Sequence, residues 1–386
     1  MRRRRREEEL ERIRMKPDKA LATAAAAGDL NAMHAMLDED CTLAANWKPI
    51  MDACYAGQAD AVALLLEHGA DPNVKSRSAH HYRPLHRTVE YKKTAPKHDG
   101  HHQVVKLLLE AGADPLMQGS YTFISAIAVC ATGESTEFLP ALLDSAPRRY
   151  DIFHAAVLGD ASRVNALLKD DPALAKAHHE GSKIWTSDKG WTPLTYCVSS
   201  RVGNDSEKKR KALAQIAGSL IEHGADLTGC VDQAIYRDNS EVFELLLKAG
   251  GRCADDDTLN HAACDGHFDA LELLLKHGAA LDGTRGTDHH GGYTPLGCTV
   301  SCRSIQGARW FLEKGQDPNN IKSKDGENCL HVAVHFGASD KMLQLLLDYG
   351  AKIDQKDKQG RTPLARAHEK KHKKAISFLE ASGATA

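Results

Sequence analysis

The sequence is poor in aromatic residues, has almost no net charge, and contains neither a long apolar run nor a CxxC pair. Phe, Trp and Tyr make up 5% of the 386 residues, which is little for one large core or for a platform on which nucleic-acid bases stack. The formal net charge is −2, so the chain as a whole has no general attraction to nucleic acid or to an anionic membrane. No apolar stretch reaches the roughly 20 residues needed to span a membrane.

Cysteine usage and the N-terminus both favour the cytoplasm. The ten cysteines form no CxxC pair, and several occupy helical positions that suit small residues, as expected of reduced, buried thiols. The arginines at 2–6 are followed by glutamates at 7–9 rather than by an apolar segment, so no signal peptide is predicted. Residues 1–17 are predicted to be a charged tail or a frayed helix, and the alternative is a small anchor for an anionic partner.

A phrase recurs along the chain: a helix of small residues, a glycine turn, a leucine-rich helix and then Gly-Ala. It is clearest at residues 261–279, where HAACDGHF leads into LLLKHGA. The first helix of a unit begins at a pair such as Thr294 and Pro295, because proline lacks the amide that has no partner there and threonine can cap the helix. A glycine such as Gly278 suits a left-handed cap at the end of the second helix. Related segments lie at 61–73, 104–115, 217–227, 242–251 and 341–354.

Leucine triplets are expected to hold these helices together, since helices this short are marginal alone. Burying one leucine contributes about 1.5–3 kcal/mol. A triplet in every unit, packed between neighbours, can therefore stabilise a stack in which a single unit would unfold. The triplets lie at 64–66, 107–109, 245–247, 273–275 and 345–347. This pattern moves the question of function from a pocket to an extended surface.

Four short segments at the start of a first helix carry a family resemblance. They are residues 83–86 (RPLH), 191–194 (WTPL), 293–296 (YTPL) and 328–331 (NCLH), and they resemble the Thr-Pro-Leu-His segment of the ankyrin repeat. The resemblance covers nearly everything after residue 18. It implies an all-α ankyrin-repeat solenoid of about eleven helix-turn-helix units with extended fingers between repeats. Two units depart from the pattern: the one near 123–144 lacks the proline, and the one near 229–251 keeps little of the first helix.

A slower repetition suggests the domain organisation. Residues 28–44 parallel 159–175, and the EHGAD at 67–71 recurs at 222–226. We therefore predict a tail at 1–17, a first sub-array at 18–147 and a second sub-array at 148–386, stacked continuously because solenoid units need neighbours on both faces. Pro147 at the boundary would discourage a continuing helix.

Insertions mark the surface where a partner is expected to bind. Residues 74–82, 176–190 and 283–292 lengthen the fingers, and the resemblance implies that fingers and the ends of first helices line a concave binding face. Aromatic and arginine side chains are the usual anchors of such interfaces, although each Trp and Tyr could instead pack across an adjacent repeat. The finger candidates are His80, His81, Tyr82, Lys183, Trp185, Trp191, His289, His290 and Tyr293. The helix-end candidates are Tyr55, Tyr91, Tyr236, Arg237, Asp265 and Phe336.

Catalytic and metal-binding patterns are weak. Residues 368–372 (HEKKH) have the form of a zinc-protease motif, but the repeat places the second histidine in the turn between two helices, which breaks the required spacing. His331 occupies the Thr-Pro-Leu-His slot, and the resemblance implies a structural role for it. Cys298 and Cys302 are one turn apart at positions that pack. No phosphate-binding glycine loop or nucleophile elbow is present.

From these features we expect a non-catalytic scaffold or adaptor that binds another protein. We expect it to be a cytoplasmic monomer that needs no cofactor and no metal, and to contact neither membrane nor nucleic acid. Two alternatives stay open. One is a metal-dependent enzyme, or a metal or pH sensor, that uses the histidine doublets of the fingers. The other is a structural scaffold that associates with itself.

Overall fold

The computed structural model describes residues 17–90, 99–133, 135–146, 150–182, 190–204, 206–237, 239–253, 257–278, 293–321 and 324–385. Contacts divide the chain into two compact units, Met1–Asp226 and Leu227–Ala386, and each is described by itself. The described residues are mostly helical, and they include a short antiparallel hairpin in which β1 (Gln118–Gly119) pairs with β2 (Ile124–Ser125). None of the helices in these ranges is long and apolar enough to cross a membrane.

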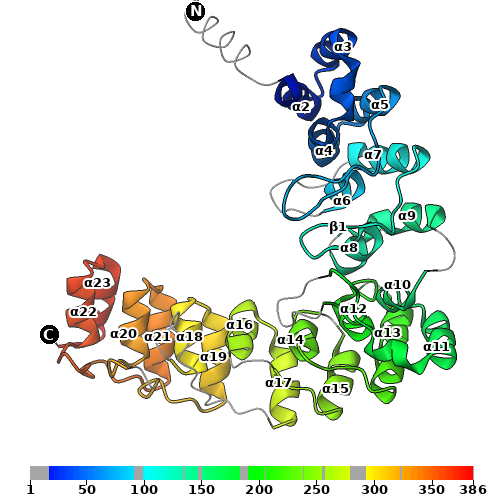
Figure 1. Ribbon diagram of the computed structural model, residues 1–386. Coiled ribbons are helices and arrows are strands. Elements are labelled where there is room, and N and C mark those ends of the chain that lie inside the picture. Colours follow the sequence, from blue (N-terminus) through cyan, green and yellow to red (C-terminus); the bar gives the residue numbers. More distant parts are fainter. Residues whose placement is uncertain are drawn as a thin grey trace, which may run out of the picture. The chain divides into compact units, whose positions relative to one another are not determined.

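The first unit contains helices that follow one another in pairs along the chain (Figure 1). They are α2 (Pro17–Ala27), α3 (Leu30–Glu39), α4 (Trp47–Ala56), α5 (Ala59–Glu67), α6 (Pro84–Val89), α7 (Asp99–Glu110), α8 (Ala126–Thr132), α9 (Leu139–Ser145), α10 (Ile152–Val157), α11 (Ala161–Asp170), α12 (Pro193–Ser199) and α13 (Glu207–Glu222). Three 3-10 turns accompany them: η1 (Cys41–Ala45), η2 (Thr136–Phe138) and η3 (Pro172–Lys176).

The second unit continues the same construction. Its helices are α14 (Cys230–Ile235), α15 (Ser240–Lys248), α16 (Asp257–Asp265), α17 (Phe268–Lys276), α18 (Pro295–Ser301), α19 (Ile305–Glu313), α20 (Cys329–His335), α21 (Asp340–Asp348), α22 (Pro363–Glu369) and α23 (Lys373–Ala381). Over the described residues of both units the helices make eleven successive pairs, from α2 with α3 to α22 with α23. The predicted all-α repeat architecture is therefore confirmed.

Local sequence explains where the helices begin and end. Proline occupies the first turn of α6, α12, α18 and α22. Thr192, Thr294 and Thr362 cap three of these helices, each accepting a hydrogen bond from a main-chain amide in the first turn. Gly57, at the end of α4, has φ +70°, a left-handed conformation that glycine adopts without strain. The two units that depart from the repeat pattern also form their helices: Ser125 caps α8, and α14 starts after Gly229.

The core runs between neighbouring pairs. First helices pack on first helices, as α18 does on α20 and α20 on α22, while second helices pack on second helices, as α19 does on α21. The central leucine of each triplet lies in this core: Leu65, Leu108 and Leu246 are fully buried, Leu346 likewise, and Leu274 nearly so. Each triplet thus binds its own pair to its neighbours, as the sequence predicts.

The slower repetition has a local structural counterpart. Asp40 and Asp171 cap η1 and η3, each accepting a hydrogen bond of 3.0 Å from the main-chain amide two residues on. The predicted boundary after residue 147 falls inside the first compact unit, where α8 contacts both α10 and α12. The division into sub-arrays at 18–147 and 148–386 stays a prediction, and residues 1–16 and 147–149 lie outside the described residues.

Candidate partner-binding surface

The predicted site residues fall into separate groups along the two units. Ten of the fifteen are described. The other five lie outside the described residues: Tyr91, Lys183, Trp185, His289 and His290.

One group centres on Arg87, which projects from α6 between two tyrosine rings. Its guanidinium lies 4.3 Å from the ring centre of Tyr55 and 5.1 Å from that of Tyr82. Arg87 also pairs with Glu90 at 3.2 Å, and the hydroxyl of Tyr82 donates to the same carboxylate at 2.9 Å. Burial, together with the charge of Glu90, raises the pKa of Tyr82 well above its usual value, so the phenol stays protonated as a donor.

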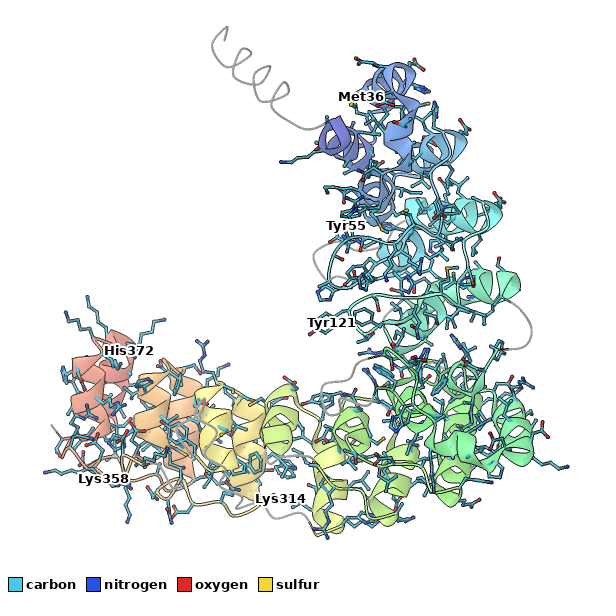
Figure 2. All side chains as sticks on the ribbon, viewed as in Figure 1. Met36, Tyr55, Tyr121, Lys314, Lys358 and His372 are labelled. Carbon is cyan, nitrogen blue, oxygen red and sulfur yellow. The ribbon has the colours of Figure 1, made fainter. Side chains whose placement is uncertain are left out.

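Two neighbouring fingers extend this group. The ring of His80 lies 4.8 Å from the ring of Tyr121 and 6.0 Å from that of Tyr82, while His81 meets Phe123 edge to face at 5.6 Å. Tyr121 is 46% exposed. Tyr55 and Tyr121 lie along the same side of the first unit (Figure 2). We name Tyr55, His80, Tyr82, Arg87 and Tyr121 the finger cluster.

Hydrogen bonds to main-chain carbonyls fix the conformation of the two fingers that carry the finger cluster. Ser76 donates its main-chain amide to the carbonyl of Tyr82 at 2.8 Å. Arg83 reaches across to the next finger, where its Nε donates to the carbonyl of Gln118 at 2.9 Å. His81 and Phe123 have positive φ angles of 49° and 57°, a conformation that costs non-glycine residues energy and persists only where surrounding contacts impose it.

Sequence reasoning found three members of the finger cluster and missed Arg87 and Tyr121. Arg87 lies one helical turn after Arg83 and faces Tyr55 of the preceding repeat. A search for arginine at that helical position beside a finger tyrosine would have found it. Tyr121 precedes the helix pair that lacks the usual proline, so the repeat pattern does not predict an aromatic residue there.

Trp191 packs into the first unit rather than standing on its surface. It is 8% exposed, and its ring lies 5.0 Å from the ring of Tyr196. Tyr196 in turn contacts His179, whose Nδ1 bonds to the tyrosine hydroxyl and whose ring stacks on Phe153 at 4.9 Å. These contacts give Trp191 and His179 places in the packing between repeats.

In the second unit the candidate residues are spread out. Tyr236 is half-buried against His267, with ring centres 5.2 Å apart, and Arg237 is half-buried beside it. Asp265 is exposed at the end of α16. Tyr293 donates its hydroxyl to Glu327 at 2.8 Å. Phe336 is 41% exposed after α20, with its ring 4.8 Å from that of His335.

Ser125, His154 and Asp151 form a relay with the distances of a hydrolase triad. His154 Nε2 lies 2.8 Å from the hydroxyl of Ser125, and His154 Nδ1 lies 2.7 Å from a carboxylate oxygen of Asp151. Burial acts to raise the pKa of Asp151, but hydrogen bonding to His154 and the histidine's charge outweigh it and hold the pKa below its ordinary value. Ser125 is 0% exposed, and its oxygen accepts from the amide of Ala128 as the cap of α8. A substrate cannot reach that oxygen, so the relay is structural.

The zinc-protease-like segment does not form a metal site. Helix α22 ends at Glu369, and His372 sits beyond the turn with its Nδ1 2.8 Å from the carbonyl of Val334. The two histidines are therefore not on one helical face. Among the described residues no group of three or more His, Cys, Asp or Glu side chains is placed to hold a metal ion. His80 and His81 contact aromatic rings, as described above. Cys298 is buried, as expected, whereas Cys302 is exposed.

Comparison with known proteins bears directly on this architecture. The family profile described as ankyrin repeats (3 copies) matches residues 21–119, 231–322 and 318–385. The human transient receptor potential cation channel subfamily A member 1 is 27% identical over 136 residues, which are 34% of this chain and 12% of that protein. Human ankyrin repeat and SOCS box protein 16 is 27% identical over 218 residues, which are 56% of this chain and 42% of that protein.

The match to a solved structure is looser. The human ASB11 ankyrin repeat domain superposes with a TM-score of 0.44 at 19% identity, covering 62% of this chain and 100% of that domain. The chain spans less than half the length of each of the two human proteins above.

Proposed function

The chain belongs to the ankyrin repeat family, whose repeats are generally protein–protein interaction modules, and from that premise we propose that it is a non-catalytic scaffold that binds another protein. The binding face is the one formed by first helices and fingers, and the finger cluster is its anchor. The observation that carries this proposal is the stacking of Arg87 between Tyr55 and Tyr82, with His80 linking Tyr82 to the exposed ring of Tyr121.

The chemistry of the finger cluster suits a binding anchor. Tyrosine and arginine are enriched among residues that lose much binding energy when truncated, because they combine large contact area with directed polar groups. Tyr121 offers an exposed ring, and Arg87 keeps a planar charge fixed over two aromatic faces. A partner carboxylate or aromatic ring would meet a surface that is both apolar and hydrogen-bonding.

Pre-organisation further supports the proposal. Arg87 is held by Glu90, and His80 is held between the rings of Tyr82 and Tyr121. Side chains ordered before binding lose little further entropy when a partner arrives, so more of the contact energy appears as affinity. The positive φ angles of His81 and Phe123 indicate that the fingers hold their shape at some conformational expense.

Under this proposal the protein is a monomer and works in the cytoplasm. The thiols of Cys54, Cys130 and Cys197 are packed as core atoms, each at most 1% exposed. Reduced thiols in such positions are typical of a reducing compartment.

The test begins with proximity labelling by the full chain in its own cells, followed by purification of the labelled protein and titration against variants. We expect Arg87→Ala or Tyr121→Ala to weaken binding by roughly 30-fold, which corresponds to about 2 kcal/mol for an anchor residue. Tyr349→Ala is the matched control, because Tyr349 is 37% exposed but lies in the second unit. Equal affinity of the wild type and both cluster variants would contradict the proposal.

A further inference from the structure

The last two repeats carry a concentrated positive surface at the turns between their paired helices. Residues 368–374 read HEKKHKK, and Lys370, Lys371, Lys373 and Lys374 are all exposed. Of the nearby carboxylates, Glu369 pairs with Arg361 at 3.0 Å, and that of Glu380 lies 3.8 Å from the imidazole of His368. Figure 2 shows nitrogen-tipped side chains projecting from the chain around His372.

An exposed aromatic ring lies at the neighbouring turn. His372 bonds to the carbonyl of Val334, which joins the α22–α23 turn to the end of α20. Arg366 Nη2 lies 3.1 Å from His335 Nδ1, and the ring of His335 contacts Phe336. Phe336, 41% exposed, thus directly follows two residues, Val334 and His335, that contact the last repeat.

The electrostatic environment of His335 agrees with a positive surface. Burial lowers the pKa of His335, and the charges of Lys370 and Arg366 lower it further. The charges of these two cations therefore affect the pKa of His335, whose ring contacts Phe336, more than the buried carboxylate of Glu327 does.

Lys371 also has a left-handed backbone conformation, which favours glycine over lysine. It has φ +57° in the turn after the first helix of its unit. At the equivalent turn other units have glycine with φ between +67° and +88°, among them Gly57, Gly159, Gly266 and Gly337, whereas the α18–α19 turn has Arg303 with φ +61°. Glycine would adopt this conformation without the steric cost that lysine bears. A charged residue at a position that favours glycine points to a use for the charge.

We propose that this surface binds an acidic segment of a partner protein, and that the segment carries one apolar side chain. We name it the lysine turn surface, and it consists of Phe336, Lys370, Lys371, Lys373 and Lys374. The lysines would meet carboxylates, and Phe336 would receive the apolar side chain. This surface lies in the second unit and is separate from the finger cluster, so it stands whether or not that cluster binds a protein.

The size of the surface favours a short peptide over other anionic ligands. Binding of duplex nucleic acid rests on many phosphate contacts spread along a stripe of cations, whereas these lysines occupy one turn. Stable membrane association needs a larger buried apolar face in addition to cations, and the lysine turn surface offers one exposed phenylalanine. Four cations beside one ring match a few carboxylates around one apolar residue.

Fluorescence anisotropy of the full chain tests this inference. The probe is a fluorescein-labelled peptide with three glutamates on each side of a tryptophan, measured at about 50 and about 150 mM salt. Lys371→Gly removes one charge and relaxes the turn, so the protein should be at least as stable while binding weakens about two- to fivefold. Replacing all four lysines by glutamine should weaken binding tenfold or more. Lys356→Gln, at an exposed lysine in a finger of the same unit, should leave it unchanged.

Peptide variants separate the two parts of the surface. Changing the glutamates of the peptide to glutamines should abolish binding. With a peptide whose tryptophan is changed to alanine, Phe336→Ala should cause a much smaller loss of affinity than it does with the original peptide. Equal binding of the glutamine peptide, or unchanged affinity in the four-lysine variant, would overturn the proposal. So would tighter lysine-dependent binding of a DNA duplex or of phosphatidylserine vesicles, because the ligand would then be a different macromolecule.

Discussion

The side chain of His331 hydrogen-bonds to the main chain of Arg361 in the next repeat. Its Nε2 donates to the carbonyl of Arg361 at 2.9 Å, while its Nδ1 accepts from the amide of Asn328 at 3.2 Å. His86 makes the equivalent contact in the first unit, with Nε2 2.9 Å from the carbonyl of Ile124. Each buried imidazole thus bonds to the main chain of the next repeat, and His331 also closes the start of its own helix.

We expect His331→Ala to destabilise the second unit by about 2–3 kcal/mol, because it empties a fully buried position and leaves the main-chain amide of Asn328 without its partner. It also leaves the carbonyl of Arg361 with only the amide of Asp357, at 2.9 Å. His277→Ala is the control, since His277 is exposed at the end of α17, and it should change stability by less than about 0.5 kcal/mol. Urea unfolding followed by circular dichroism measures both. Similar midpoints for the two variants would show that the bond between repeats adds little.

The same buried position in the first unit predicts an acid-sensitive stability. Burial lowers the pKa of His86 to about 4, below the ordinary histidine value of about 6.5. The unfolded chain therefore binds a proton between these two pH values while the folded chain does not, and stability falls as pH drops through that window. The loss at pH 4 is on the order of 3 kcal/mol.

Replacing His86 by glutamine removes this titration. Urea unfolding at pH 7 and pH 4.5 should show a smaller acid-induced loss in His86→Gln than in the wild type, even though the variant is less stable at pH 7. His331, whose pKa is also lowered by burial, contributes in the same direction in the second unit. An identical pH dependence in the wild type and the variant would refute the assignment to His86.

The repeat periodicity was enough to predict the helix pairs because each unit depends mainly on its immediate neighbours. The prolines, threonine caps and central leucines act locally or between adjacent units, so their positions in the sequence are their positions in the fold. The finger cluster was harder to predict. It depends on the stacking of Arg87 on a tyrosine from the preceding repeat and on the place of Tyr121 in a finger that departs from the pattern. Neither contact follows from periodicity.

The triad-like relay and the lysine turn show two further limits of sequence reasoning. Ser125 caps α8, whereas Asp151 and His154 belong to the start of α10, and the three form no recognisable sequence motif. Only burial shows that the serine is inaccessible. The HEKKH segment has the form of a metal-binding motif, but its lysines instead form an exposed positive surface. Lys371 lies in that surface with a left-handed backbone conformation. Backbone angles at non-glycine residues cannot be read from spacing alone.

Two glycines close together in the chain should respond in opposite ways to alanine. Gly218 lies inside α13 with no atom within 4 Å of an added Cβ, so Gly218→Ala should stabilise the first unit by about 0.5–1 kcal/mol. Gly224 has φ +78°, and an added Cβ would lie 3.0 Å from Lys176 Cε, so Gly224→Ala should destabilise it by about 1–2 kcal/mol. Thermal unfolding followed by circular dichroism distinguishes them, and a shift of the same sign in both would contradict the structure.

A buried ion pair in the second unit should couple far more strongly than an exposed one. Glu327 and Arg366 are 2.8 Å apart with side chains only 2% and 10% exposed, and Glu327 also accepts from Tyr293. Glu327→Ala would leave Arg366 buried beside fewer carboxylate oxygens, which costs about 3 kcal/mol or more in such sites. Adding Arg366→Met to Glu327→Ala should recover part of that loss, because the unpaired charge is then gone.

The matched comparison is Lys106 with Glu110, whose side chains are 75% and 60% exposed and 3.8 Å apart. A double-mutant cycle on this pair should give a coupling of about 0.5 kcal/mol or less, and about 1 M salt should remove it. The cycle on Glu327 and Arg366 should exceed 1 kcal/mol and persist in salt, because screening ions do not enter the packed interior between α20 and α22. Equal, salt-sensitive couplings would mean that Arg366 is hydrated in solution, and the close packing of the last repeats would then need revision.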